Sequence, residues 1–301
     1  RVKEIPDDRT TFLRSMKETF DREMFGLEKA KEQLLVFANA RISNPMMKEC
    51  TLGLIGPTGV GKTSLAYLLA ECLTLPFAKI ACGGISDPDT LKGHAYTYIG
   101  SRPGEIVNAM IDLKCNNGVI LMDEFEKIST NKSITSMLLH VLDPAQNFCF
   151  QDDYLGRDIR INLGGIWFIL SMNGVPSDHA LADRIFTVTI DGYTFTEKLE
   201  IAKRHLIPKI CKNLKISTDV ITFTDSSLKY LINTVSHDCK GVRSINHALR
   251  EIITKIHFLQ ETGINVSFSI KNITKPFLVT EDVVEKIIPP RVISESLSYI
   301  S

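Results

Sequence analysis

The stretch TLGLIGPTGVGKTSLAYLLAECL, residues 51–73, decides the fold of this chain. Five residues typical of a buried strand, TLGLI, run directly into GPTGVGKT (56–63), and a helical pattern follows. The octapeptide matches GxxxxGK[ST] at every fixed position and stands between a strand and a helix, as a phosphate-binding loop requires. Its glycines let backbone N–H groups point at phosphates, and the positive end of the helix assists them. This context favours nucleotide binding over a chance match.

Two side chains of the loop have expected parts in holding a nucleotide. Lys62 supplies a flexible positive charge for the β- and γ-phosphates, and the hydroxyl of Thr63 suits Mg²⁺. We assign the phosphate-binding segment to Gly56, Pro57, Thr58, Gly59, Val60, Gly61, Lys62, Thr63 and Ser64.

Short apolar strands alternate with helices around this loop. Strands are expected at residues 51–55, 77–81, 119–122, 166–171 and 185–190. Helices are expected at residues 21–41, 63–73, 106–113 and 134–142. Such alternation predicts an α/β fold with a mostly parallel sheet covered by helices on both faces.

The pattern changes from Thr194 onward. Helices are expected at residues 197–214, 225–234, 242–260 and 280–288, and a small hairpin at 266–270 with 277–279. The sequence therefore predicts an N-terminal connector (1–20), a large α/β nucleotide-binding domain (21–192), a small, mainly α-helical lid domain (193–290) and a C-terminal tail (291–301).

Two carboxylates follow the apolar strand VILM (119–122). A buried strand that ends in Asp123 and Glu124 is costly unless a cation or a water uses these groups. Asp123 would complete the Mg²⁺ shell, and Glu124 would polarise an attacking water, which favours hydrolysis over phosphoryl transfer to a metabolite. The simpler alternative is an acidic cap of the next helix.

Three further polar residues are candidates for the same chemistry. Asn173 ends the strand WFILSM and could orient the water, although Asn is also common in turns. Arg184 precedes the last strand and suits an arginine finger that reaches a neighbour's nucleotide, but from its position alone a surface ion pair is the simpler interpretation. Arg243 could act as a lid sensor or be a solvated charge.

Composition limits the classes of protein to which this chain can belong. Lys+Arg and Asp+Glu both number 35 in 301 residues, and this balance gives no support for a nucleic-acid-binding protein. Seven cysteines without a CxxC pair indicate free thiols in a reducing compartment rather than a zinc site. No apolar run has the roughly 18 residues of a membrane span, and no signal peptide is visible. The start at Arg1 is interpreted as a cut boundary.

Taken together, these motifs resemble the AAA+ ATPase module of Lon proteases. The resemblance covers about residues 21–290 in order, and its motifs are more specific than a phosphate loop alone. The matching stretches are DREMFGLEKAKEQL (21–34), GPTGVGKTS (56–64), GGISDPDTLKGHAYTYIGSRPGEI (83–106), VILMDEFEKI (119–128), VLDPAQNFCFQDDYL (141–155), DGYTFTEKLEIAKRHLIPK (191–209) and GVRSI (241–245).

The resemblance implies roles for the weaker candidates. Asn173 falls at the family's sensor 1, Arg184 at its arginine finger and Arg243 at its sensor 2. Phe25 and Gly26 fall where the family has a Tyr-Gly beside the adenine, and Phe keeps the ring while losing the hydroxyl.

The resemblance also explains the loop GHAYTYIGSRPG (93–104). Tyr98 and Ile99 match the family's pore loop, which lines the axial channel of a hexamer. A ring and an aliphatic branch can grip an extended polypeptide without reading its sequence, since the contact is mostly apolar area. Tyr96 would be either a second gripping residue or a buttress.

The expected function is that of an ATP- and Mg²⁺-dependent motor, a homo-hexamer that unfolds and threads unfolded or misfolded proteins. No GPSAG-like serine turn occurs, so no peptidase activity of the family's kind is expected from this chain. A non-proteolytic remodeller remains the alternative, with a nucleotide-locked scaffold and a DNA-loading ring as weaker ones. An intracellular, cytoplasmic location is expected, with an organelle matrix left open; neither a membrane nor a nucleic acid is an expected partner.

Overall fold

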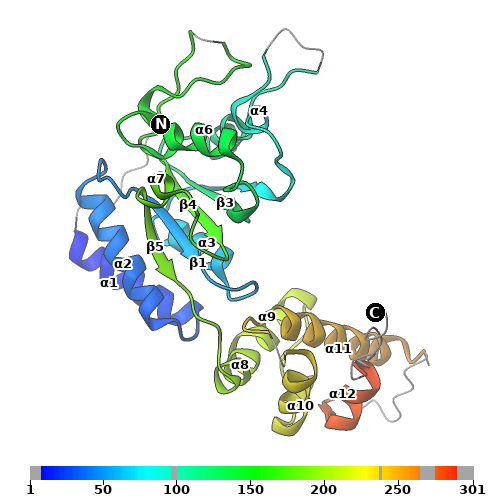
Figure 1. The fold of residues 1–301 in the computed structure, drawn as a ribbon. Helices are drawn as coiled ribbons and strands as arrows, with labels where there is room; N and C mark the ends of the chain where they lie inside the picture. Colours follow the sequence, from blue (N-terminus) through cyan, green and yellow to red (C-terminus); the bar gives the residue numbers. More distant parts are fainter. Residues whose placement is uncertain (1–7, 96–99, 157, 237–238, 265–274, 290–301) are drawn as a thin grey trace, which may run out of the picture. The chain divides into compact units, whose positions relative to one another are not determined.

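The computed structural model describes residues 8–95, 100–156, 158–236, 239–264 and 275–289 (Figure 1). The chain divides into two compact units. The first comprises residues 1–57 and 61–191, and the second comprises residues 58–60 and 192–301.

The first unit contains a five-stranded sheet in the order β2-β3-β4-β1-β5, in which every pairing is parallel. The strands are β1 (Thr51–Ile55), β2 (Phe77–Ala81), β3 (Val119–Asp123), β4 (Trp167–Met172) and β5 (Ile185–Thr189). The predicted strands and the predicted parallel α/β sheet are confirmed, with bounds that differ by one residue at most.

Burial along the strands follows their place in the sheet. All six residues of β4 are buried, as are the first four of β1 and of β3, whereas the edge strands β2 and β5 include exposed positions. A central parallel strand is covered on both faces, which is why its sequence is a nearly continuous apolar run.

The helices of the first unit surround this sheet (Figure 1). They are α1 (Arg9–Glu23), α2 (Glu28–Ser43), α3 (Lys62–Cys72), α4 (Asp89–Lys92), α5 (Glu105–Leu113), α6 (Lys132–Leu142) and α7 (His179–Ala182). Helix α3 packs against β3 and β4, α5 against β2, and α2 against β5. The ring centroid of Phe37 on α2 lies 5.9 Å from the ring centroid of Trp167 and 5.3 Å from that of Phe186. Aromatic contacts therefore join this helix to the sheet.

The polar stretch expected as an N-terminal connector, residues 1–20, passes into a helix. Helix α1 begins at Arg9 after Asp8, whose side chain accepts from the backbone N–H of Thr11 at 3.2 Å. Met16 and Phe20, four residues apart on one face of α1, are buried and fix the helix to the unit. Residues 24–27 are not helical, so the helix expected over 21–41 is divided: its first three residues belong to α1, and the rest is α2.

The second unit is mainly helical. Its helices are α8 (Phe195–Ile201), α9 (Ile207–Leu214), α10 (Asp225–Ser236), α11 (Arg243–Thr262) and α12 (Glu281–Ile287). A π-helical turn, Ala202–Leu206, joins α8 to α9, and a capping box of Thr194 and Glu197 starts α8. The apolar face of α11 supplies much of this unit's core, through Ile245, Ala248, Leu249, Ile252, Ile253, Ile256 and Leu259.

One strand pair in this unit has no counterpart in the sequence analysis. Strand β7 (Phe277–Val279) pairs in parallel with β6 (Ile221–Phe223). The hairpin partner expected for β7, residues 266–270, lies outside the described residues. Three-residue strands more than fifty residues apart leave no local signal, because parallel pairing joins segments that no turn connects.

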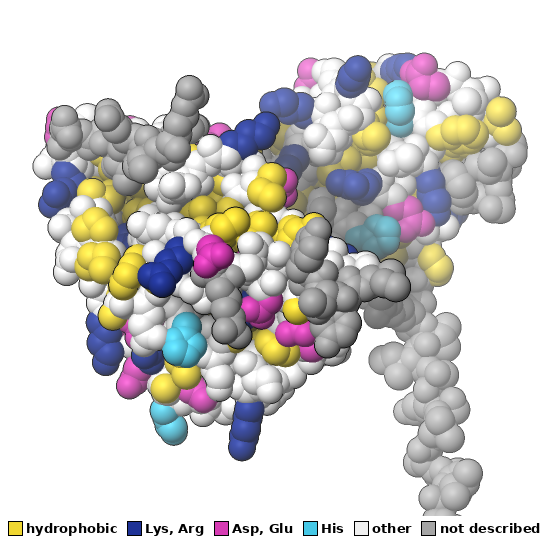
Figure 2. Space-filling model, turned by 90° about the horizontal axis from the view of Figure 1, so that it is seen from above, with side chains coloured by type: hydrophobic (Ala, Val, Ile, Leu, Met, Phe, Trp, Pro, Cys, Tyr) yellow, Lys and Arg dark blue, Asp and Glu magenta, His cyan; other side chains and the backbone are white. Residues whose placement is uncertain are grey.

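Acidic side chains lie between basic ones on the face drawn in Figure 2, which agrees with the equal numbers of the two kinds, 35 each. In the described ranges, none of the helices combines the length and the apolar character needed to cross a membrane.

Candidate functional site

The candidate site lies at the carboxyl edge of the sheet. Strands β3, β4 and β1 are neighbours and run in the same direction, so the segments that follow them meet there. The ends of these strands and the segments after them carry the phosphate loop, the Asp123–Glu124 pair and Asn173. Crevices outside the carboxyl ends of parallel strands are where open α/β sheets bind ligands.

The phosphate loop depends on two of its glycines. A Cβ atom on Gly56 would lie 2.3 Å from the carbonyl oxygen of Ile190, so only glycine lets the loop pass β5 this closely. Gly61 has a left-handed φ of 100° and precedes the first residue of α3. The loop thereby turns back on itself and leaves the first N–H groups of α3 without helical partners, as an anion site requires.

Lys62 is held by groups of its own chain. It is 8 % exposed, and Nζ donates to the carbonyl oxygens of Gly56 and Pro57, the latter at 3.0 Å. Nζ also donates to Oδ1 of Asn173 at 3.0 Å, which joins the phosphate loop to the end of β4. Burial lowers the pKa of Lys62, while the negative charges of Glu126 and Asp123 oppose this shift.

Asp123 ends β3 in a set of polar contacts. Its Oδ2 lies 2.6 Å from Nζ of Lys79 on β2, and its Oδ1 accepts from the N–H of Glu124 at 3.2 Å. Burial by itself would raise the pKa of this carboxyl, but hydrogen bonds from Lys79 and Ser171 and the charge of Lys79 outweigh it and lower the pKa. Asp123 is therefore a carboxylate at neutral pH, as a ligand of Mg²⁺ must be.

The third acid of the segment DEFEK, Glu126, was missed by the sequence analysis. Asn173 donates from Nδ2 to Oε1 of Glu126 at 2.6 Å, whereas Glu124 is exposed, with a left-handed φ of 56°. Residues 125–127 form a single 3-10 turn, which brings Glu126 back toward the sheet edge. The only available signal was a third carboxylate three residues after Asp123, which is also common on solvated helix ends.

Comparison with known proteins indicates the family of this chain. Residues 52–177 match the family model described as ATPase family associated with various cellular activities (AAA). Proteins named Lon protease from Malacoplasma penetrans and Halothermothrix orenii are 36 % and 38 % identical over 254 and 247 residues, which is 83 % and 81 % of this chain. A Lon protease homolog, mitochondrial, from Debaryomyces hansenii is 34 % identical over 81 % of the chain. This chain carries a Lon-type AAA+ module.

The chain spans only part of these relatives, between 22 % and 32 % of their length. The solved structure of a RuvB mutant from Thermogota maritima superposes on this chain with a TM-score of 0.58 at 16 % sequence identity. The match covers 91 % of this chain and 72 % of the RuvB chain. At this identity the likeness concerns the fold alone, and it supports the assignment of the AAA+ fold.

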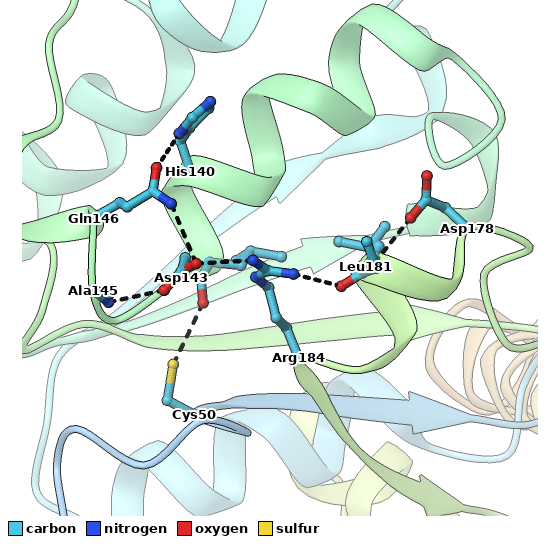
Figure 3. Close-up of polar contacts among 10 residues, drawn as sticks. Cys50, His140, Asp143, Ala145, Gln146, Asp178, Leu181 and Arg184 are labelled. Carbon is cyan, nitrogen blue, oxygen red and sulfur yellow. Dashed lines mark hydrogen bonds and ion pairs between the residues drawn. The ribbon is translucent and has the colours of Figure 1, made fainter.

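In this Lon-type module the arginine-finger candidate is engaged within its own chain (Figure 3). Arg184 donates to Oδ2 of Asp143 and to the carbonyl oxygen of Ala180, both at 2.8 Å. The ion pair is mostly buried, with side chains 23 % and 16 % exposed. The structure thus shows the ion pair that position alone suggested, and action on a neighbour's nucleotide stays a prediction.

The Arg184–Asp143 pair predicts a pH-dependent stability. The hydrogen bond from Arg184 is the main reason that the pKa of Asp143 is below its ordinary value of 3.8. A lowered folded-state pKa stabilises the fold above the unfolded-state value and is lost as the pH falls through the folded-state value. We expect Arg184→Ala to cost about 1 kcal/mol near neutral pH, and we expect this cost to shrink as the pH falls below 3.8 toward the lowered pKa of Asp143.

Urea unfolding followed by the fluorescence of Trp167, the single tryptophan of the chain, measures this effect in the first unit. Arg160→Ala, at an exposed position, is the control. A difference between parent and Arg184→Ala that is independent of pH would contradict the role given to Asp143.

The other predicted residues are placed as follows. Phe25 and Gly26 lie in the break between α1 and α2. Arg243 is the first residue of α11 in the second unit, after Val242, whose N–H donates to Gly59 at 3.0 Å within that unit. Tyr98 and Ile99 lie outside the described residues, as does Tyr96.

Proposed function

We propose that this chain binds Mg²⁺-ATP and hydrolyses it, and that the protein assembles into a ring, a homo-hexamer, that unfolds and threads protein substrates. The observation that carries the proposal is the contact between Lys62 of the phosphate loop and Asn173 at the end of β4. It brings a phosphate-binding cation within 3.0 Å of an amide that can orient a water, at the edge where Asp123 ends β3 and Glu124 follows it.

Each side chain has a part in this reaction. Lys62 would neutralise the β- and γ-phosphates, and Asn173 and Glu124 would orient and polarise the attacking water. Thr63 and Asp123 would hold Mg²⁺, which neutralises charge developing on the phosphates. Their hydroxyl and carboxylate oxygens are the hard ligands this cation prefers, and Thr63 is exposed at the start of α3.

Residues outside this edge of the sheet would complete the nucleotide site. Phe25 and Gly26 would contact the adenine, Arg243 would sense the nucleotide from the second unit, and Arg184 would reach the nucleotide of a neighbouring subunit. Arg184 must first leave Asp143, so its action as a finger implies that the ring contact replaces this ion pair.

The coupling to polypeptides rests on the relatives and on the sequence. Proteins named Lon protease act on proteins, and the Tyr98–Ile99 pair matches the loop with which their family grips substrate. We further propose an intracellular location, either a cytoplasm or an organelle matrix like that of the mitochondrial relative.

Tyr98→Ala tests the coupling. We expect an unfolded protein such as casein to stimulate steady-state ATP hydrolysis by the parent chain, and we expect this stimulation to disappear in Tyr98→Ala with basal turnover kept. Phe258→Ala, which removes a ring that is 42 % exposed on α11, is the control. If hydrolysis is changed neither by unfolded protein nor by Tyr98→Ala, a non-proteolytic remodeller is favoured. If the parent chain does not hydrolyse ATP at all, the proposed ATPase activity is refuted.

A further inference from the structure

The side chain of Asn173 joins two groups of opposite charge. Its Oδ1 accepts from Nζ of Lys62 at 3.0 Å, and its Nδ2 donates to Oε1 of Glu126 at 2.6 Å. The second carboxylate oxygen, Oε2, is buried and has no hydrogen-bond partner among the described residues. Glu126 therefore makes its short contact here with the amide of Asn173.

The two neighbours decide which way this amide faces. A carboxylate has no hydrogen to donate, so Oδ1 turned toward Glu126 would meet it oxygen to oxygen. An ammonium has no lone pair to accept, so Nδ2 turned toward Lys62 would be equally unfavourable. Both contacts are charge-assisted and favour a single orientation.

We propose that Glu126 is a positioning residue for hydrolysis, which acts by holding the Asn173 amide with Oδ1 toward the phosphate loop. This inference rests on the ATPase function proposed above. It adds the third acid of the segment DEFEK to the site, with a role different from the roles of Asp123 and Glu124.

The orientation of the amide matters because all three N–H donors of the Lys62 ammonium have acceptors in the structure. An ammonium has three N–H donors, and Lys62 directs Nζ to Gly56, Pro57 and Asn173. When phosphates draw Lys62 away, Oδ1 of Asn173 is released and can accept a hydrogen from the attacking water. If the amide were reversed, Nδ2 would face that water and could not accept.

Glu126→Gln removes the preference for one orientation of the Asn173 amide and changes the shape of the side chain very little. A glutamine can present either its oxygen or its NH₂ to Asn173, so both amide orientations become acceptable. We expect the kcat for ATP to fall about tenfold with KM within about threefold, since the lost interaction serves the reaction rather than binding. A melting temperature close to that of the parent chain would show that the fold is kept.

A double-mutant cycle separates this role from a general effect of charge. If Glu126 acts through Asn173, Glu126→Gln should change kcat less than about twofold in an Asn173→Ala background. The same tenfold loss in both backgrounds, or no loss in the parent, would overturn the proposal.

A second measurement does not require turnover. In ¹⁵N–¹H spectra, the Asn173 side-chain resonances, assigned by their loss in Asn173→Ala, should move upfield in Glu126→Gln as the bond to a carboxylate is lost. Unmoved resonances would overturn the proposal even in an inactive chain. By contrast, a parent chain without hydrolysis but with the expected shift would refute the ATPase and keep the Glu126–Asn173 contact.

Discussion

Glu124→Gln is expected to lower the ATP turnover number by roughly a thousandfold, because general-base catalysis contributes about 10²–10⁴ and an amide cannot take the proton of the attacking water. Glu124 is exposed directly after β3, beside Asp123, at the edge that carries the phosphate loop. Its φ of 56° is rare for a residue other than glycine, and such backbone strain is concentrated at functional positions. Nucleotide binding should stay within about threefold of the parent, since the substitution leaves the phosphate loop unchanged.

Steady-state hydrolysis and titration with a fluorescent ADP analogue measure the two quantities. Glu32→Gln, the same chemical change at an exposed position of α2, is the control and should leave both unchanged. Turnover within about threefold of the parent would remove Glu124 from the base role and would leave Glu126 as the remaining glutamate of the segment.

Asp152→Ala is expected to destabilise the first unit by at least about 3 kcal/mol, because it leaves three N–H donors without their acceptor at roughly 1–3 kcal/mol each. Asp152 is 1 % exposed. Its carboxylate accepts from the N–H groups of Gly104 at 2.8 Å, Tyr154 at 2.9 Å and Leu155 at 3.1 Å. It thereby joins the segment that enters α5 to the loop after Phe150, and these two segments are some fifty residues apart in the chain.

The neighbouring Asp153 provides a matched control. Its carboxylate lies 3.2 Å from Nζ of Lys92, but both side chains are well exposed, so Asp153→Ala should cost less than about 1 kcal/mol. Urea unfolding followed by the fluorescence of Trp167 measures both variants in the unit concerned. Equal losses for the two variants would show that the buried hydrogen bonds of Asp152 do not carry the stability assigned to them.

Asp152 also bears on the pore loop proposed above. The loop 93–104 is closed at its base by a bond from the N–H of His94 to the carbonyl oxygen of Arg102 at 3.2 Å, and Asp152 holds its last residue, Gly104. A milder change, Asp152→Asn, keeps one acceptor oxygen and should destabilise less than Asp152→Ala.

The sheet could be predicted because its signal is local. TLGLI, VILMD and WFILSM are almost entirely apolar, as is typical of parallel strands that are buried on both faces. The phosphate loop marks the residue at which the first of them ends. The start of α1 was less visible, since only Met16 and Phe20 of its residues are buried and most of the others are polar. The pairing of β6 with β7 was invisible, because it joins distant three-residue segments.

The sequence by itself determined that this chain has a phosphate loop in a parallel α/β sheet, since glycines, a lysine and apolar runs at fixed spacing have few other uses. It also supplied the acids and the amide that belong near the loop. Only the tertiary structure decided which of them touch: Asn173 lies between Lys62 and Glu126, and Arg184 pairs with Asp143. Spacing along the chain cannot show these contacts, because they depend on strand order and on a single 3-10 turn that carries a side chain back to the sheet edge.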